Sequence, residues 1–221
     1  MTTIEEAKKE CAICGNVSNH MEIISTKALG SSDLDARPPE PERSTIDYWV
    51  QRCPTCGYCA PDISKGDKEM SNIIESDEYK HQLNDAGLPE LANSFLCWSM
   101  IKEEEAQYKI AGWTSVKAAW ACDDAQNDEA ARKCRERAIM LLDTARKKGQ
   151  WFAGNAGTEE AVIVDLLRRS GQFDAALRMC NERLEKEPEK FIHDVLIYQK
   201  KLVEKGDIAR HATAEIIGEI G

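Results

Sequence analysis

Two Cys-x-x-Cys pairs, Cys11 with Cys14 and Cys53 with Cys56, constrain the fold more than any other feature of this chain. Each pair points two thiolates at one place, and two pairs complete the tetrahedral four-cysteine arrangement typical of a structural zinc ion. The second pair stands in the sequence Cys-Pro-Thr-Cys-Gly-Tyr. Its proline fixes the start of the turn, and Gly57 can adopt the left-handed conformation that turns backbone N–H groups toward the sulfurs. The spacing predicts one structural Zn²⁺ held by these four cysteines.

Other uses of the cysteine pairs fit the sequence less well. The segment between Cys14 and Cys53 is longer than the usual ribbon spacing of about 15–20 residues, but the cost of closing a loop grows only logarithmically with its length. A catalytic zinc usually recruits His or Glu and keeps one position open, and neither His20 nor His81 has ligand spacing. A redox Cys-x-x-Cys normally lies in a βαβ context, which the pattern does not show.

The composition of the chain predicts the cellular compartment in which the protein works. The chain has 221 residues and nine cysteines, and it contains no run of about 18 apolar residues. Its polar first ten residues lack the apolar core of a secretory signal. Cysteines without an export signal favour a reducing compartment and metal binding over disulfides. We therefore expect a cytoplasmic protein with no membrane partner.

Charge argues against the commonest role of a zinc ribbon. The net charge is −10, and residues 1–61 hold six Lys/Arg against nine Asp/Glu. Nucleic-acid binders usually present a basic stripe, because phosphate neutralisation supplies much of their affinity. No nucleic-acid partner is therefore expected.

The chain divides into two parts by pattern. Residues 1–61 carry the metal motifs and predict a small β zinc ribbon, with strands over 20–27 and 45–52 and a proline-containing loop over 30–44. From residue 62 to 221 helical periodicity takes over. Apolar residues share one face of a predicted helix at Leu91, Phe95, Trp98 and Ile101, and a long helix over 127–148 ends before a glycine. The fold class is therefore mainly α with a small N-terminal β ribbon.

The last third of the chain carries a repeat-like pattern. Gly171 stands where a tetratricopeptide repeat turns between its two helices, and Ala176 stands where the helices approach closely. A degenerate copy covers residues 112–147, and segments 191–205 and 207–217 predict a last pair of helices. The pattern indicates tetratricopeptide-like antiparallel helical repeats, which offer a concave surface to a partner.

Further motifs extend along the ribbon. Residues 32–39 read Ser-Asp-Leu-Asp-Ala-Arg-Pro-Pro, residues 43–45 Arg-Ser-Thr and residues 48–51 Tyr-Trp-Val-Gln, before the Cys-Pro-Thr-Cys-Gly-Tyr of 53–58. With the first cysteine pair and the Asp-Leu-Leu-Arg-Arg-Ser-Gly of 165–171, the chain resembles over nearly its whole length a bacterial domain-of-unknown-function family, number 2225. The resemblance implies a zinc ribbon joined to tetratricopeptide-like helices in a cytoplasmic protein, and no reaction. Cys59 departs from that pattern, in which a small residue is commoner.

Four arginines are the candidate binding residues. Arg37 and Arg43 lie in the loop 32–43 and have two interpretations. Their guanidinium groups bind an anion or a protein terminus, or they pair with local acids and pack on aromatic rings. The second interpretation is favoured. Arg168 and Arg169 either line a repeat groove and bind a peptide carboxylate or form a solvated helix end.

Cys59 extends the second pair by the same spacing and leaves three interpretations open. It is a substitute ligand, a reactive thiol beside the metal, or a buried neighbour of the turn, of which the last is favoured. The other cysteines lie in helical patterns and predict small core residues; they are Cys97, Cys122, Cys134 and Cys180.

No recognised catalytic motif occurs in the sequence. It contains no nucleophile elbow, Walker loop, dinucleotide fingerprint or His-Glu-x-x-His. The favoured hypothesis is a non-enzymatic interaction protein that binds an unidentified protein or peptide. The alternative is a metal- or thiol-dependent enzyme or redox sensor that uses Cys59 and the loop 32–43.

Overall fold

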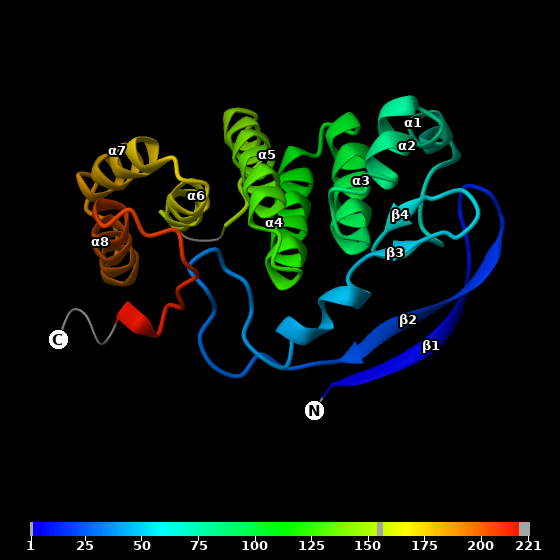
Figure 1. The fold of residues 1–221 in the computed structure, drawn as a ribbon, viewed down its shortest axis with the longest axis horizontal. Helices are drawn as coiled ribbons and strands as arrows, with labels where there is room; N and C mark the ends of the chain where they lie inside the picture. Colours follow the sequence, from blue (N-terminus) through cyan, green and yellow to red (C-terminus); the bar gives the residue numbers. More distant parts are fainter. Residues whose placement is uncertain (1, 154–156, 217–221) are drawn as a thin grey trace.

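A computed structural model describes residues 2–153 and 157–216. The chain is mainly helical, with a small antiparallel β part at its N-terminal end, as the sequence predicts (Figure 1). The strands are β1 (Thr3–Glu10), β2 (Val17–Ser25), β3 (Gln51–Arg52) and β4 (Cys59–Ala60). The helices are α1 (Ser71–Ile74), α2 (Asp77–Leu83), α3 (Glu90–Glu104), α4 (Tyr108–Asp124), α5 (Asp128–Lys147), α6 (Thr158–Arg169), α7 (Phe173–Leu184) and α8 (Lys190–Glu204).

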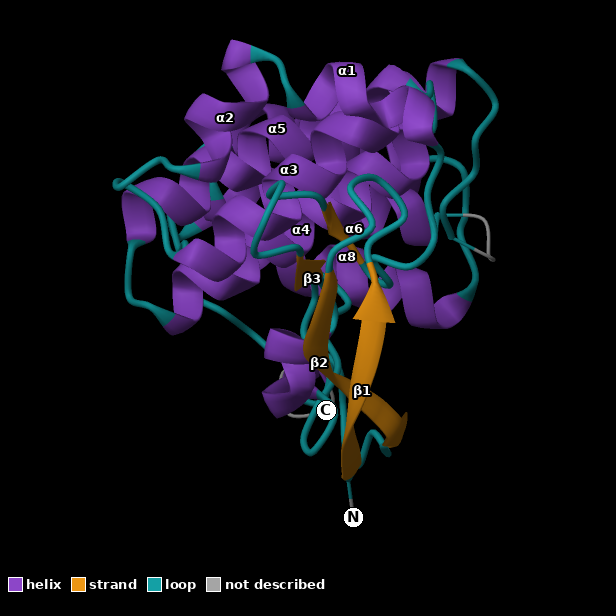
Figure 2. Cartoon of the chain, turned by 90° about the vertical axis from the view of Figure 1, so that its right-hand side faces the viewer, coloured by secondary structure: helices purple, strands orange, loops and turns teal. Residues whose placement is uncertain are grey.

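The strands form two antiparallel hairpins. β1 pairs with β2 from Thr3 opposite Ser25 to Glu10 opposite Val17, and β3 pairs with β4. The long β1–β2 ribbon projects away from the helices (Figure 2), whereas β3 and β4 lie beside α3 (Figure 1). Each hairpin turn contains one Cys-x-x-Cys pair, so the two pairs lie at the tips of separate hairpins.

The predicted strand over 45–52 is wrong for most of its length. Residues Arg43–Tyr48 form a 3₁₀ helix, and only Gln51–Arg52 are extended. The Thr45 hydroxyl donates to the Glu42 carbonyl at 2.7 Å, a local bond that competes with strand pairing. Ile46 and Val50 are buried at helical rather than alternating spacing. The strand predicted at 20–27 is confirmed over residues 20–25, whereas β2 begins earlier, at Val17, and ends at Ser25.

Helices α3 to α8 pack beside one another in chain order (Figure 1). Three links between them share one geometry, with a left-handed residue at Ala106 (φ 55°), Gln126 (φ 55°) or Gly171 (φ 75°). In each link, two successive N–H groups bond back to carbonyls of the last helical turn; Gly171 bonds to Arg168, and the next residue bonds to Leu167. These tight turns reverse the chain, and the turn predicted at Gly171 is confirmed.

The helix predicted over 207–217 is wrong for residues 207–214, and Ile217 lies outside the described residues. After α8, residues 207–216 cross back as a strap onto the loop 32–43 (Figure 1). Thr213 N–H donates to Ser32 O at 2.8 Å, and Leu34 N–H donates to His211 O at 3.0 Å. Arg168 binds the carbonyls of Asp207 and Ala209, which a helix would need as acceptors. Contacts with distant residues therefore replace helix formation.

One apolar core runs from the ribbon into the helices. Tyr58 and Ile63 are fully buried beside Tyr79 of α2 and Phe95 of α3. Within the described residues, no helix is long and apolar enough to span a bilayer.

Candidate metal centre

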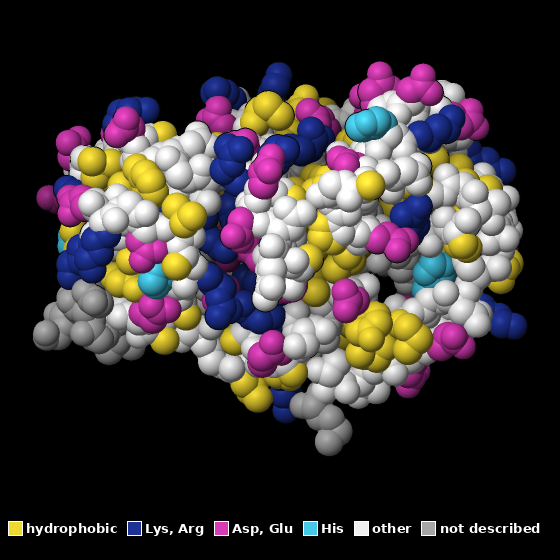
Figure 3. Space-filling model, viewed as in Figure 1, with side chains coloured by type: hydrophobic (Ala, Val, Ile, Leu, Met, Phe, Trp, Pro, Cys, Tyr) yellow, Lys and Arg dark blue, Asp and Glu magenta, His cyan; other side chains and the backbone are white. Residues whose placement is uncertain are grey.

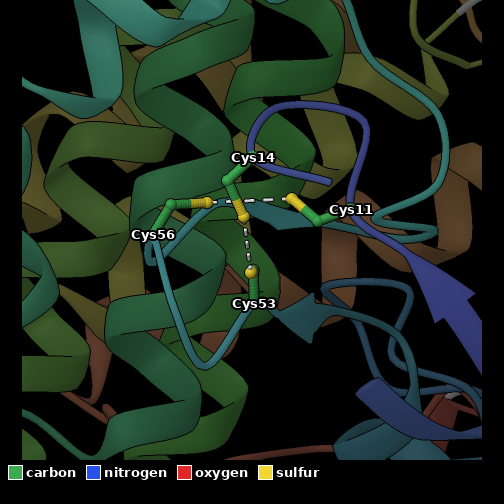
Figure 4. A group of neighbouring side chains, drawn as sticks. All are labelled: Cys11, Cys14, Cys53 and Cys56. Carbon is green, nitrogen blue, oxygen red and sulfur yellow. Dashed lines mark hydrogen bonds between the residues drawn. The ribbon is translucent and has the colours of Figure 1, made fainter. Parts of the chain in front are cut away.

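Four cysteine sulfurs converge where the tips of the two hairpins meet (Figure 4). Cys11 Sγ lies 3.7 Å from Cys56 Sγ, and Cys14 Sγ lies 3.6 Å from Cys53 Sγ. All four sulfurs lie within 4.8 Å of one another. A tetrahedral ion with metal–sulfur bonds of about 2.3 Å needs sulfur–sulfur edges of about 3.8 Å. The spacing fits such an ion and is far longer than the about 2.05 Å of a disulfide.

The two turns have the same construction. Gly15 and Gly57 follow the second cysteine of each pair, with φ of 72° and 76°. Each glycine N–H donates to the carbonyl of the first cysteine, at 2.8 Å for Cys11 and 3.0 Å for Cys53. At the second turn a larger residue would also displace a neighbour, because a Cβ on Gly57 would lie 2.4 Å from Leu83 Cδ2.

Backbone N–H groups prepare the site for thiolates. Burial raises the pKa of Cys11, while hydrogen bonds from the N–H groups of Cys14 and Ile13 act to lower it. At Cys53 burial also acts to raise the pKa, but hydrogen bonds from the N–H groups of Cys56 and Thr55, together with those of the Cys56 and Cys14 thiols, outweigh it, and the pKa is lowered. A bound cation favours the thiolate of every ligand. The donor set and its dipoles therefore suit a thiolate-bound metal.

The helices support the second turn through a residue that sequence analysis missed. Tyr79 of α2 is fully buried, and its hydroxyl donates to Gly57 O at 3.0 Å and accepts from Cys59 N–H at 3.1 Å. Tyr58 donates to Lys65 O at 2.7 Å and packs edge-to-face on Trp98 of α3. The only sequence signal for Tyr79 is an aromatic residue in a short helical pattern, which does not reveal its partner.

Cys59 lies outside the four-sulfur cluster. Its side chain is 0% exposed, and its thiol donates to Gly57 O at 3.3 Å. The pKa of the Cys59 thiol is lowered, because hydrogen bonds, above all with Cys97, outweigh the opposing effect of burial. The position agrees with the interpretation of Cys59 as a buried neighbour of the turn. The cysteines of the helices are buried too, as expected; they are Cys97, Cys122, Cys134 and Cys180.

The loop 32–43 is held by ion pairs at both of its candidate arginines. Arg43 Nη2 lies 2.6 Å from Asp33 Oδ2, within the loop. Arg37 reaches α4, where its guanidinium donates to both carboxylate oxygens of Asp124 at 2.9 and 2.5 Å and stacks 5.8 Å from the ring centroid of Trp120. The geometry favours the structural interpretation and adds a partner in α4 that the local sequence did not suggest.

Arg169 joins the same network from α6. Its guanidinium donates to Asp35 at 3.0 Å and to Asp123 at 2.9 Å, and Arg135 of α5 also binds Asp123. Charged side chains gather in the hollow between α5 and the end of α6 (Figure 3), a cleft of about 760 Å³. The arginines of this charged cleft are thus largely neutralised by neighbouring carboxylates.

Arg168 does not line a groove. Its side chain is 0% exposed, its guanidinium pairs with Asp165 at 2.6 Å, and it donates to carbonyls of the strap. Neither the groove nor the solvated helix end predicted from the sequence describes this residue.

No protein-family model, curated protein or solved structure matches this chain.

Proposed function

We propose that this chain is a cytoplasmic, non-enzymatic interaction protein in which one structural Zn²⁺ fixes a ribbon against tetratricopeptide-like helices. This is the kind of protein that the resemblance to family 2225 implies. The main observation in support of this proposal is the cluster of four sulfurs at the spacing of a tetrahedral metal site. Zinc suits it because four thiolates are a zinc donor set, and because a closed set leaves no position for a substrate.

The proposed interaction role rests on the helices, which the metal site does not involve directly. Helices that stack in chain order through short turns present extended surfaces, which proteins of this construction use to bind peptides or proteins. The second cysteine turn is bonded to α2 through Tyr79, and the loop 32–43 is bonded to α4 through Arg37, so the metal would help to fix the N-terminal part against the helices.

The alternative function, a thiol-dependent enzyme or redox sensor, requires an accessible thiol. Cys59 is fully buried, and the loop arginines proposed to assist it are paired with Asp33 and Asp124. Burial withholds a thiol from substrates and oxidants.

A thiol titration of the zinc-loaded protein at neutral pH separates the two functions. We expect no fast-reacting thiol, since zinc occupies four cysteines and burial shields the others. A fast-reacting thiol that disappears in Cys59→Ser would establish the alternative. Affinity capture from native cytoplasm, compared between the intact chain and Cys53→Ala/Cys56→Ala, then tests the interaction role; equal capture by both would contradict a metal-supported binding surface.

A further inference from the structure

A second cleft lies between the N-terminal segment and helices α3 and α4, and several of its lining side chains are aromatic. It has a volume of about 670 Å³, and Trp49, Trp98, Trp113 and Trp120 line it together with Phe152. This size falls within the about 300–1,000 Å³ of typical ligand sites, which are mostly apolar with a few polar groups. We call it the aromatic cleft.

One face of α4 supplies the inner wall. Ile110, Trp113, Lys117 and Trp120 follow one another at spacings of three or four residues, so they share a face of the helix. The segment that follows the 3₁₀ helix adjoins this wall, since Trp49 packs edge-to-face on Trp120 with ring centroids 6.3 Å apart.

The aromatic walls are fixed before any ligand binds. Trp120 Nε1 donates to Asp35 at 2.8 Å, and Trp49 Nε1 donates to Thr45 at 2.8 Å. Trp113 packs edge-to-face on Phe152 with centroids 6.1 Å apart. A preformed wall loses little conformational entropy on binding, which favours affinity.

Three charged side chains line this cleft: Lys109 and Lys117 of α4, and Glu42 of the N-terminal segment. Of these, Lys117 lies against an aromatic ring and forms no ion pair within the described residues. Its Nζ lies 5.4 Å from the ring centroid of Trp49, and within residues 2–153 and 157–216 no carboxylate or hydrogen-bond acceptor pairs with it. Burial lowers the pKa of this lysine. Its situation differs from that of the charged cleft, where carboxylates already neutralise the arginines.

We propose that the aromatic cleft binds the C-terminal end of a peptide whose last residue is large and apolar, with its terminal carboxylate on Lys117 and its side chain against Trp49 and Trp113. Two lysines against one glutamate leave the cleft with one net positive charge, which matches a single carboxylate, and an apolar wall matches the adjoining side chain. The cleft is too small for a long segment, so it suits the end of a chain. This inference rests on the proposed interaction function and specifies its site.

Calorimetric titration of the zinc-loaded full chain tests the site with two matched probes, acetyl-Leu-Leu-Phe with a free carboxylate and its C-terminal amide. We expect the free acid to bind at least tenfold more tightly. Lys117→Met should abolish that preference, Lys117→Arg should retain it, and Trp113→Ala should weaken both probes. The control Lys8→Met changes an exposed lysine on β1 and should match the unaltered chain. Melting curves of each variant verify that it is folded.

Three results would overturn the inference. The amide binding as tightly as the acid would remove Lys117 from the site. Acetyl-phenylalanine binding as tightly as the tripeptide would identify a small-molecule acid as the ligand. The third result is that neither probe binds, while a captured partner still binds the Trp113→Ala variant normally. The interaction surface would then lie elsewhere, and the proposed function would stand. Failure of the proposed function is seen separately, as an absence of zinc from the protein.

Discussion

Arg168 shows what local sequence reveals about a single residue and what it does not. Its place near the end of a helix suggests a solvated or groove-facing cation, yet its partners Asp207 and Ala209 lie in the strap after α8. The four cysteine ligands are different, because the Cys-x-x-Cys spacing itself encodes their convergence. Tyr79 could not be identified in advance, since its role depends on how α2 packs on the ribbon.

Removing the Arg168 charge should destabilise the protein strongly. Arg168→Met leaves the Asp165 carboxylate buried without its partner, and breaking such a buried pair costs about 3–5 kcal/mol. Urea unfolding measures the loss. The control Arg210→Met alters an arginine whose side chain is 56% exposed and should change stability by less than about 0.5 kcal/mol. Equal effects of the two changes would contradict the interior role of Arg168.

Enlarging Ala176 should also destabilise the protein, through steric crowding. Its side chain is 0% exposed within α7, so Ala176→Leu adds volume where there is no space, at a cost of about 1–3 kcal/mol. Thermal melting is the measurement. Arg178→Leu, at an exposed position of the same helix, is the matched control. A melting temperature unchanged by Ala176→Leu would show that the helices do not approach closely there.

At the scale of elements, sequence patterns succeed where the structure is locally determined. The long helix α5 begins and ends within a residue of its predicted bounds, since Asn127 caps its start and a glycine follows its end. The 3₁₀ helix at Arg43–Tyr48 and the strap are missed because distant contacts decide them. Arg168 holds the strap, and Trp49 packs on Trp120 of α4.

Removing one hydroxyl group, that of Tyr79, tests the contact between α2 and the second cysteine turn. Tyr79→Phe removes the bonds to Gly57 O and Cys59 N–H and should cost about 1–3 kcal/mol, because it leaves buried backbone groups unpaired. Loss of metal to a chelator should become faster, since the turn is held less firmly. Tyr108→Phe removes a hydroxyl at the start of α4 and should leave metal release unchanged. Identical release from both variants would exclude support by α2.

The strap should respond to acid through Glu215. Burial acts to raise the pKa of Glu215, but the Ala212 N–H and hydrogen bonds with His211 and Tyr198 hold the pKa below its usual value. A carboxyl with a lowered pKa contributes stability above its unfolded value of 4.5, and the contribution is lost as the pH falls through the lower folded value.

Glu215→Gln should therefore lower the urea midpoint at pH 6, and the difference from the unaltered chain should shrink as the pH falls below about 4. Comparing the two proteins at each pH cancels the effect of acid on the metal site. A difference that grows on acidification would contradict the assignment.

At the scale of the whole molecule, the sequence predicts the two parts but not how they join. Patterns identify a ribbon and a set of helices, whereas the joint is made by single long-range bonds, such as Arg37 to Asp124 and Asp35 to Arg169. The core continues across the predicted boundary at residues 61 and 62. Trp49 and Pro61 of the aromatic cleft flank the β3–β4 hairpin that carries the second cysteine pair, so the proposed metal would hold in place part of the surface on which the proposed function depends.

Metal content is the most direct test of this account. Elemental analysis of the purified chain should give one zinc per molecule, and Cys53→Ala/Cys56→Ala should give none. The matched control Cys122→Ala/Cys134→Ala removes two buried thiols outside the cluster and should keep its zinc. A chain purified without zinc, or zinc unchanged in the Cys53→Ala/Cys56→Ala variant, would contradict the central claim that the two cysteine turns share one structural zinc.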